Sequence, residues 1–148
     1  MNADNTLIDR LMLSYQSFNS ESIGEIVSLY HDNVVFTDPV TQINGRDALK
    51  SYFSAMAEGL NACEFHFEQV VTQPKGDVFH SSLTWVMTFS HPRLSSGASI
   101  SVPGVSYLQH SNREIFSHRD YYDLGNMLYE HVPVVGAIVR KIRQRLEH

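Results

Sequence analysis

A change of hydrophobic period near residue 60 constrains this 148-residue chain more than any other feature. Before that point, apolar residues recur three and four positions apart, which is the spacing of amphipathic helices. From residue 64 onward, long runs rich in Val, Phe, Tyr and Thr have the two-residue alternation of half-buried strands. The sequence therefore predicts an α+β domain in which helices pack on one face of a sheet.

The turn and cap signals divide the chain into elements. Ser22 and Glu25 have the spacing of a capping box, and the Asn44-Gly45 pair is a strong turn signal before a third helix that closes near Gly59. The expected elements are helices with apolar faces at Leu7 to Phe18, Ile23 to Tyr30 and Ala48 to Met56, a short strand at 34–37, long strands at 64–72, 78–90, 100–110 and 114–123, and a last helix at 132–145.

Composition and charge narrow the class of protein and its partners. The chain is 43% hydrophobic and 18% charged, and its single cysteine excludes an internal disulfide. Because the first residues are polar and acidic rather than a basic, apolar leader, we expect a cytoplasmic protein. Residues 140–148 carry a net charge of +3, so the rest of the chain carries −8 of the total of −5, and this acidic body predicts no nucleic-acid binding.

The last predicted helix, at 132–145, is basic and amphipathic. Its apolar stripe is expected to pack across the mouth of its own fold, with the arginines in solvent. The alternative is contact with a partner or an anionic membrane surface, which would make the protein an interaction or delivery factor. We treat 1–148 as a single domain, in which 146–148 resemble the remnant of a vector-derived tag.

Two motifs resemble the nuclear-transport-factor-2-like superfamily, and its SnoaL-like branch in particular. Residues 29–39 read Leu-Tyr-His-Asp-Asn-Val-Val-Phe-Thr-Asp-Pro and are followed by Ile-Asn-Gly-Arg-Asp-Ala-Leu at 43–49. Residues 118–123, His-Arg-Asp-Tyr-Tyr-Asp, are similar to the final-strand motif of SnoaL-like proteins and epoxide hydrolases. The superfamily also includes ketosteroid isomerases, polyketide cyclases and limonene epoxide hydrolases.

The resemblance covers nearly the whole chain and implies a specific architecture. We expect a cone-shaped, strongly curved, mostly antiparallel sheet with helices on its concave face and an apolar pocket between the two layers. SnoaL-like proteins often form homodimers through the outer face of the sheet, and an exposed aromatic such as Tyr121 would suit that interface. Fold does not determine reaction, so the function depends on the residues of the pocket.

Asp38 and Tyr15 are candidate catalytic residues. The Asp of a similar Asp-Pro is the general base in ketosteroid isomerases, so the resemblance gives Asp38 that role, and the alternative is an Asp that sets the turn at Pro39. Tyr15 lies near the place of the oxyanion-hole tyrosine of those enzymes, and the alternative is plain core. The protonated Asp that accompanies that tyrosine corresponds to Val105, so half of that oxyanion hole is missing.

The last strand supplies the third catalytic candidate, Asp120. Strand alternation places His118, Asp120 and Tyr122 on one face, and a polar face of this kind favours a pocket lining over a core. In SnoaL-like cyclases and epoxide hydrolases an Asp matching Asp120 acts as acid or base; alternatively it pairs with a neighbouring His or with Arg119. Residues 83–89 contain no charge, which disfavours an epoxide hydrolase of the limonene type.

The remaining candidates concern the ligand. With His118 and Tyr122, we expect four further residues to line the cone: Phe53, Trp85, Val105 and Tyr107. The histidines have no metal-ligand spacing and no phosphate-binding loop is present, so we expect no metal and no cofactor. Two hypotheses follow: an isomerase- or cyclase-type enzyme that moves a proton on a small apolar, carbonyl-bearing molecule, or a module that binds such a molecule unchanged. A carboxyl that reaches the pocket without an ion-pair partner favours the enzyme.

Overall fold

The computed structural model describes residues 6–127 and 133–147, which contain a six-stranded sheet. The strands are β1 (Tyr30–Thr37), β2 (Gln42–Asn44), β3 (Ala62–Lys75), β4 (Val78–Ser90), β5 (Ile100–His110) and β6 (Ile115–Tyr122). Their order is β2-β1-β6-β5-β4-β3, in which β1 and β6 are parallel and every other neighbouring pair is antiparallel. The mostly antiparallel sheet that the resemblance implies is confirmed.

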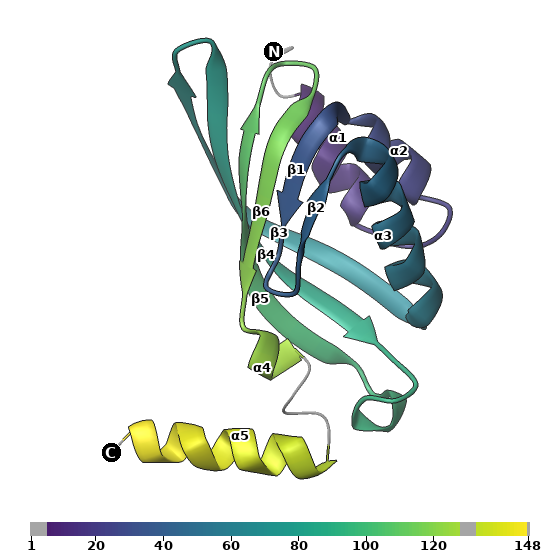
Figure 1. The fold of residues 1–148 in the computed structure, drawn as a ribbon, viewed down its shortest axis with the longest axis vertical. Helices are drawn as coiled ribbons and strands as arrows, with labels where there is room; N and C mark the ends of the chain where they lie inside the picture. Colours follow the sequence, from purple (N-terminus) through teal and green to yellow (C-terminus); the bar gives the residue numbers. More distant parts are fainter. Residues whose placement is uncertain (1–5, 128–132, 148) are drawn as a thin grey trace.

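Helices cover one face of this sheet. The covering helices are α1 (Thr6–Tyr15), α2 (Ile23–Ser28) and α3 (Arg46–Gly59). Two more helices follow the sheet in the sequence, α4 (Leu124–Met127) and α5 (Pro133–Leu146). Figure 1 shows α1, α2 and α3 together on one side of the sheet, while β3 and β4 curve beneath the end of α3. This is the predicted α+β arrangement with a C-terminal helix. In the described part of the chain, no helix is long and apolar enough to cross a membrane.

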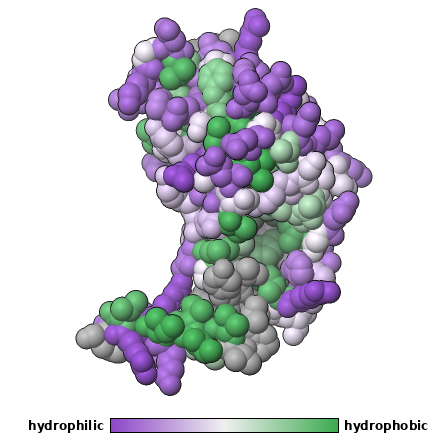
Figure 2. All heavy atoms as spheres, in the orientation of Figure 1, coloured by the Kyte–Doolittle hydropathy of each residue, from purple (hydrophilic) through white to green (hydrophobic). Residues whose placement is uncertain are grey.

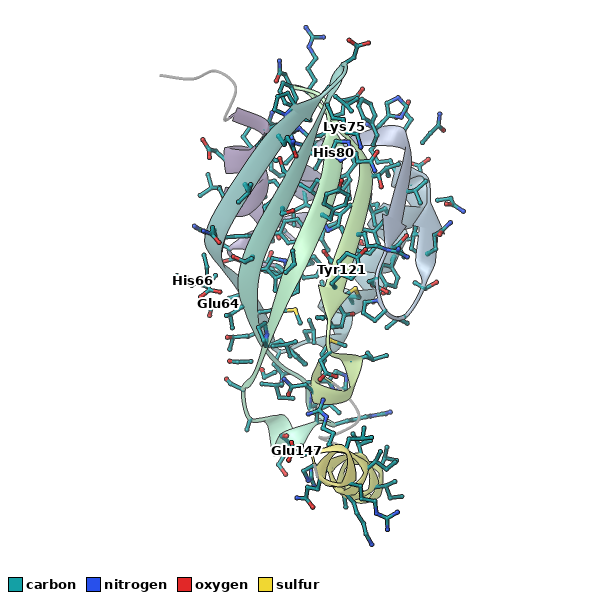
Figure 3. All side chains as sticks on the ribbon, turned by 90° about the vertical axis from the view of Figure 1, so that its left-hand side faces the viewer. Glu64, His66, Lys75, His80, Tyr121 and Glu147 are labelled. Atoms are coloured by element: carbon teal, nitrogen blue, oxygen red, sulfur yellow. The ribbon has the colours of Figure 1, made fainter. Side chains whose placement is uncertain are left out.

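The alternation along β4 shows how the sequence positions the core. Its inward residues are buried and its outward residues are partly exposed; the inward set is Ser81, Leu83, Trp85, Met87 and Phe89. Figure 3 looks onto the outer face of the sheet, where His80 and Tyr121 lie on the side away from the helices. The homodimer expected through this face stays a prediction.

Three local predictions in the helical half were wrong. Tyr30 begins β1 rather than ending the second helix, because it pairs with Ile115 of β6. Ser22 precedes α2 but makes no side-chain cap, since its hydroxyl bonds to the backbone of Asn19, and Glu25 pairs instead with Arg10. Helix α1 also ends at Tyr15, three residues before the expected apolar face ended.

Helix α5 does not pack its apolar stripe across the mouth of its own fold, as the sequence had suggested. Val135, Ile138 and Ile142 are 42%, 54% and 54% exposed. Figure 2 shows apolar side chains gathered along α5, which projects from the body of the protein. One anchor is the ion pair between Arg143 and Asp123, just after β6. Near the same point, Val139 and Arg143 of α5 lie next to Gly125 of α4, so α5 contacts the body there while much of its apolar stripe stays exposed.

Candidate functional site

A cavity of about 300 Å³ lies between the sheet and the helices. Its wall is mainly aromatic and aliphatic, with a few polar side chains. The lining residues are Tyr15, Phe18, Phe36, Asp38, Phe53, Ala55, Met56, Gly59, Leu60, Cys63, Phe65, Trp85, Met87, Phe89, His91, Asp120, Tyr122 and Met127. A concave apolar site with a few polar groups is the usual form of a small-molecule site.

Asp120 is a polar group of this cavity that the protein holds in place by one of its two carboxylate oxygens. Its Oδ1 accepts hydrogen bonds from Nε2 of His118 at 2.6 Å and from Oγ of Ser106 at 2.5 Å. Among the described residues, no donor contacts its other oxygen, Oδ2, and the side chain is 15% exposed. One oxygen is therefore anchored in the protein, while the carboxylate itself lines the cavity.

Trp85 and Gly104 support Asp120 from the sheet. They are direct partners across β4 and β5, and a Cβ on Gly104 would lie 2.6 Å from two carbons of the indole ring and closer still to a third. The missing side chain thus lets the indole lie on the backbone of β5. From there its Nε1 donates to Oγ of Ser106 at 2.9 Å, and Ser106 donates to Asp120.

A second chain of hydrogen bonds reaches Asp120 from the helical side. The hydroxyls of Tyr15 and Tyr30 are 3.1 Å apart, and that of Tyr30 lies 2.8 Å from Nδ1 of His118. Because a carboxylate only accepts, Nε2 of His118 carries a proton toward Asp120; in the neutral ring, Nδ1 then accepts from Tyr30, which accepts from Tyr15. Burial raises the pKa of both phenols, so they remain protonated.

The hydroxyl of Tyr15 is thus part of this internal chain. The ring of Tyr15 lines the cavity, as the sequence suggested for an oxyanion-hole tyrosine. In the arrangement with a neutral His118, its proton is directed at Tyr30 and not at a ligand. The described geometry therefore favours a positioning role for Tyr15.

Asp38 lies beside Asp120 but is held differently. Thr37 and Arg119 are register partners on the parallel strands β1 and β6, so the next residues, Asp38 and Asp120, lie at neighbouring positions. Oδ1 of Asp38 accepts from the backbone amides of Val40 and Thr41 at 2.8 and 2.9 Å, and Oδ2 accepts from the Tyr52 hydroxyl at 2.6 Å. Asp38 both sets the turn after β1 and lines the cavity, which combines the two roles weighed from the sequence.

No arginine side chain is paired with either carboxylate in the described residues. Arg46 forms an ion pair with Asp32 at 2.5 Å, and Arg119 lies over the ring of Tyr121 on the outer face. Asp120 reaches the cavity and also pairs with His118, which is the alternative that the sequence offered, while neither Arg46 nor Arg119 neutralises it.

Tyr122 is a polar group of the wall whose hydroxyl has no hydrogen-bond partner among the described residues. Burial raises its pKa, and the charges of Asp38 and Asp120 raise it further, so the phenol stays protonated and can donate to a ligand. Cys63 lines the same cavity, and burial raises the pKa of its thiol to about 12. The thiol is therefore neutral and unreactive near pH 7.

Only some of the predicted ligand-binding residues line the cavity. Phe53, Trp85 and Tyr122 line the cavity, whereas His118 is buried behind Asp120 and does not line it. Val105 and Tyr107 face the opposite side of β5, where Tyr107 contacts His80, so the expectation that they line the cone is corrected. Ser106 faces inward instead, because the pairing of β5 with β4 and β6 determines which half of the alternation is inside.

Three functional side chains were missed by sequence reasoning. Tyr30 and Ser106 connect to Asp120, and Tyr52 holds Asp38. The spacing of Asp38 and Tyr52 carries no signal for their contact, because β1 and α3 are brought together only by the fold. In the described residues, no group of three or more His, Cys, Asp or Glu side chains is placed to hold a metal ion.

Comparisons with known proteins agree with this fold. The family described as the SnoaL-like domain matches residues 13–118. A search of curated protein sequences found no match to this chain.

Three solved structures illustrate the similarity. A protein of ketosteroid isomerase-like fold from Catenulispora acidiphila DSM 44928, in complex with trimethylamine, is 16% identical with a TM-score of 0.68, over 82% of this chain and 88% of that chain. An NTF2-like protein of unknown function from Burkholderia pseudomallei K96243 is 10% identical with a TM-score of 0.71, over 86% and 96%. A candidate SnoaL-like polyketide cyclase from Shewanella putrefaciens CN-32 is 17% identical with a TM-score of 0.63, over 86% and 94%. At these identities the likeness establishes the fold alone.

Proposed function

The chain belongs to the SnoaL-like domain family, and we propose that it binds a small, largely apolar, carbonyl-bearing molecule in its cavity and moves a proton on it without a cofactor. The observation that carries this proposal is the asymmetric environment of Asp120. Oδ1 is anchored by His118 and Ser106, and Oδ2 has no donor among the described residues. A fixed carboxylate on the wall of an apolar cavity is suited to general-base catalysis.

Asp120 and Tyr122 supply the two groups that such a proton transfer needs. In the proposed reaction, Oδ2 of Asp120 removes a proton from the carbon next to the carbonyl group. The Tyr122 hydroxyl donates to the carbonyl oxygen and stabilises the enolate that forms. In an isomerase, Asp120 then returns the proton to another carbon. In an aldol cyclisation, the enolate carbon instead attacks a second carbonyl group of the ligand, and the proton held by Asp120 goes to the alkoxide oxygen that forms.

The network behind Asp120 gives His118 and Tyr30 positioning roles. Their hydrogen bonds and that of Ser106 hold the carboxylate in one orientation before a ligand arrives, which lowers the cost of reaching a reactive geometry. The trimethylamine in the Catenulispora structure and the cyclase candidate from Shewanella support small-molecule binding as a use of this fold.

Exchange of α-protons tests the proposal without knowledge of the natural substrate. 2-Tetralone, an apolar bicyclic ketone, is incubated with the protein in D₂O, and loss of its α-proton signals is followed by NMR. We expect exchange above the buffer rate, and Asp120→Asn should lower the protein-dependent rate by about 10²–10⁴-fold because an amide cannot accept the proton.

The matched control is Asp77→Asn, which removes the same charge from an exposed turn between β3 and β4. It should leave the exchange rate unchanged. If Asp120→Asn exchanges as fast as the native protein, the catalytic role of Asp120 is refuted. If 2-tetralone binds to the native protein without exchange above the buffer rate, the binding-module hypothesis replaces the enzyme.

A further inference from the structure

The charges on the cavity wall are of one sign. Asp38 and Asp120 both line it, and no lysine or arginine side chain does so within the described residues. Two nearby basic groups have other partners: Arg46 of α3 pairs with Asp32, and Arg119 of β6 lies over the ring of Tyr121 on the outer face of the sheet.

The histidines near the cavity do not cancel these two charges. Nδ1 of His91 accepts a hydrogen bond from the backbone amide of Arg93, so it carries no proton and the ring is neutral. His118 lies behind Asp120, and even a protonated His118 would balance only one of the two carboxylates. The cavity therefore remains net negative on its described wall.

Aromatic residues make up half of the remaining lining residues. They are Tyr15, Phe18, Phe36, Phe53, Phe65, Trp85, Phe89 and Tyr122. The face of an aromatic ring carries partial negative charge and attracts organic cations, most strongly where water is excluded. The two carboxylates on the same wall repel an anionic ligand.

We infer that the cavity selects ligands with a positively charged amine or quaternary ammonium group on an apolar body, and discriminates against carboxylates, sulfonates and phosphates. This inference rests on the proposed function and names the class of its ligand. Asp38, rather than Asp120, is the counter-charge for the cationic group of the ligand. Its two oxygens already accept hydrogen bonds from Val40, Thr41 and Tyr52, so the position of this carboxylate is fixed. Oδ2 of Asp120 then remains available for the proton transfer.

Three probes of matched shape test this selection. Phenyltrimethylammonium, tert-butylbenzene and benzenesulfonate each carry a tetrahedral group on a phenyl ring, with charges of about +1, 0 and −1 near neutral pH. Trp85 is the only tryptophan of the chain and lines the cavity, so its fluorescence reports binding directly. We expect the cation to bind at least about tenfold more tightly than the neutral probe, and the anion to bind most weakly.

Asp38→Asn separates charge from shape. The amide oxygen can still accept from the backbone amides of Val40 and Thr41, so the turn is retained. The substitution should weaken binding of the cation by about tenfold while the affinity for tert-butylbenzene changes less than about twofold. Asp77→Asn, the exposed control, should change neither affinity.

The outcomes distinguish this inference from the proposed function. If tert-butylbenzene binds as tightly as the cation, or benzenesulfonate binds most tightly, the charge selection is overturned while the cavity remains a binding site. If none of the three probes binds, the inference fails, and the exchange of 2-tetralone decides the proposed function separately. The order of the three affinities is measured on the native protein, so the test does not depend on the folding of any variant.

Discussion

Replacing Tyr30 by phenylalanine removes one oxygen atom from the hydrogen-bond network behind Asp120. The Tyr30 side chain is fully buried, and its hydroxyl contacts both the Tyr15 hydroxyl at 3.1 Å and Nδ1 of His118 at 2.8 Å. The phenyl ring keeps the shape of the side chain, so the loss is that of two buried hydrogen bonds.

The size of the effect follows from these two contacts. Two net hydrogen bonds are worth about 1–3 kcal/mol, and Nδ1 of His118 is left buried without a partner, which adds about 1–3 kcal/mol. Since the partners relax in part, we expect the free energy of unfolding to fall by about 2–4 kcal/mol. For a chain of this length, that corresponds to a Tm lower by roughly 4–16 °C.

Urea denaturation followed by Trp85 fluorescence measures this loss. Tyr121→Phe is the matched control, since it removes the same atom from a ring that is 54% exposed on the outer face, and it should change stability by less than about 0.5 kcal/mol. Combining Tyr30→Phe with Tyr15→Phe should cost less than the sum of the two single changes by about 0.5–1.5 kcal/mol, because both remove the same bond. A Tyr30→Phe protein as stable as Tyr121→Phe would refute the network.

Three further predictions concern the sheet and the last helix. Gly104→Ala should destabilise the protein by about 1–3 kcal/mol in thermal unfolding, because the added Cβ collides with the buried Trp85 ring. Burial lowers the pKa of His110 in the folded protein, so the unfolded state binds a proton more readily at this residue. The free energy of unfolding should therefore have its full value above a pH of about 6.5 and should decrease as the pH falls below that value. His110→Gln should reduce the difference between the free energies of unfolding measured by urea denaturation at pH 7.5 and at pH 5.5. A difference as large as that of the native protein would show that His110 is not its cause. Ile138→Ser should leave the free energy of unfolding within about 0.5 kcal/mol of the native value, because the side chain is 54% exposed; a larger loss would show that the stripe is buried in solution.

Much of the fold could be predicted from the sequence. The expected bounds of 78–90 and 100–110 agree with β4 and β5, because alternation in these runs is long and their turn signals are strong. The predicted common face of His118, Asp120 and Tyr122 on β6 also agrees, since side chains of a strand must alternate.

The errors came from segments where local pattern is ambiguous. Tyr30 follows helical residues at helical spacing, yet it belongs to β1 because pairing with β6 outweighs a propensity of a few tenths of a kcal/mol. For Val105 and Tyr107, both halves of the β5 alternation contain apolar residues, so the sequence does not say which half faces the helices. In α5, amphipathicity predicts a face that could be buried and says nothing about what covers it.

The sequence by itself determined the order of helices and strands, the alternation that groups His118 with Asp120, and the acidic character of the body. Only the tertiary structure decided that Ser106 and Tyr30 converge on Asp120, and that Asp38 lies beside it. The physical reason is the distance along the chain over which each effect acts. Periodicity arises from backbone geometry within a few residues, whereas the contacts of Ser106 and Tyr30 join residues far apart in the sequence, whose proximity depends on strand register and on how the sheet curves around the helices.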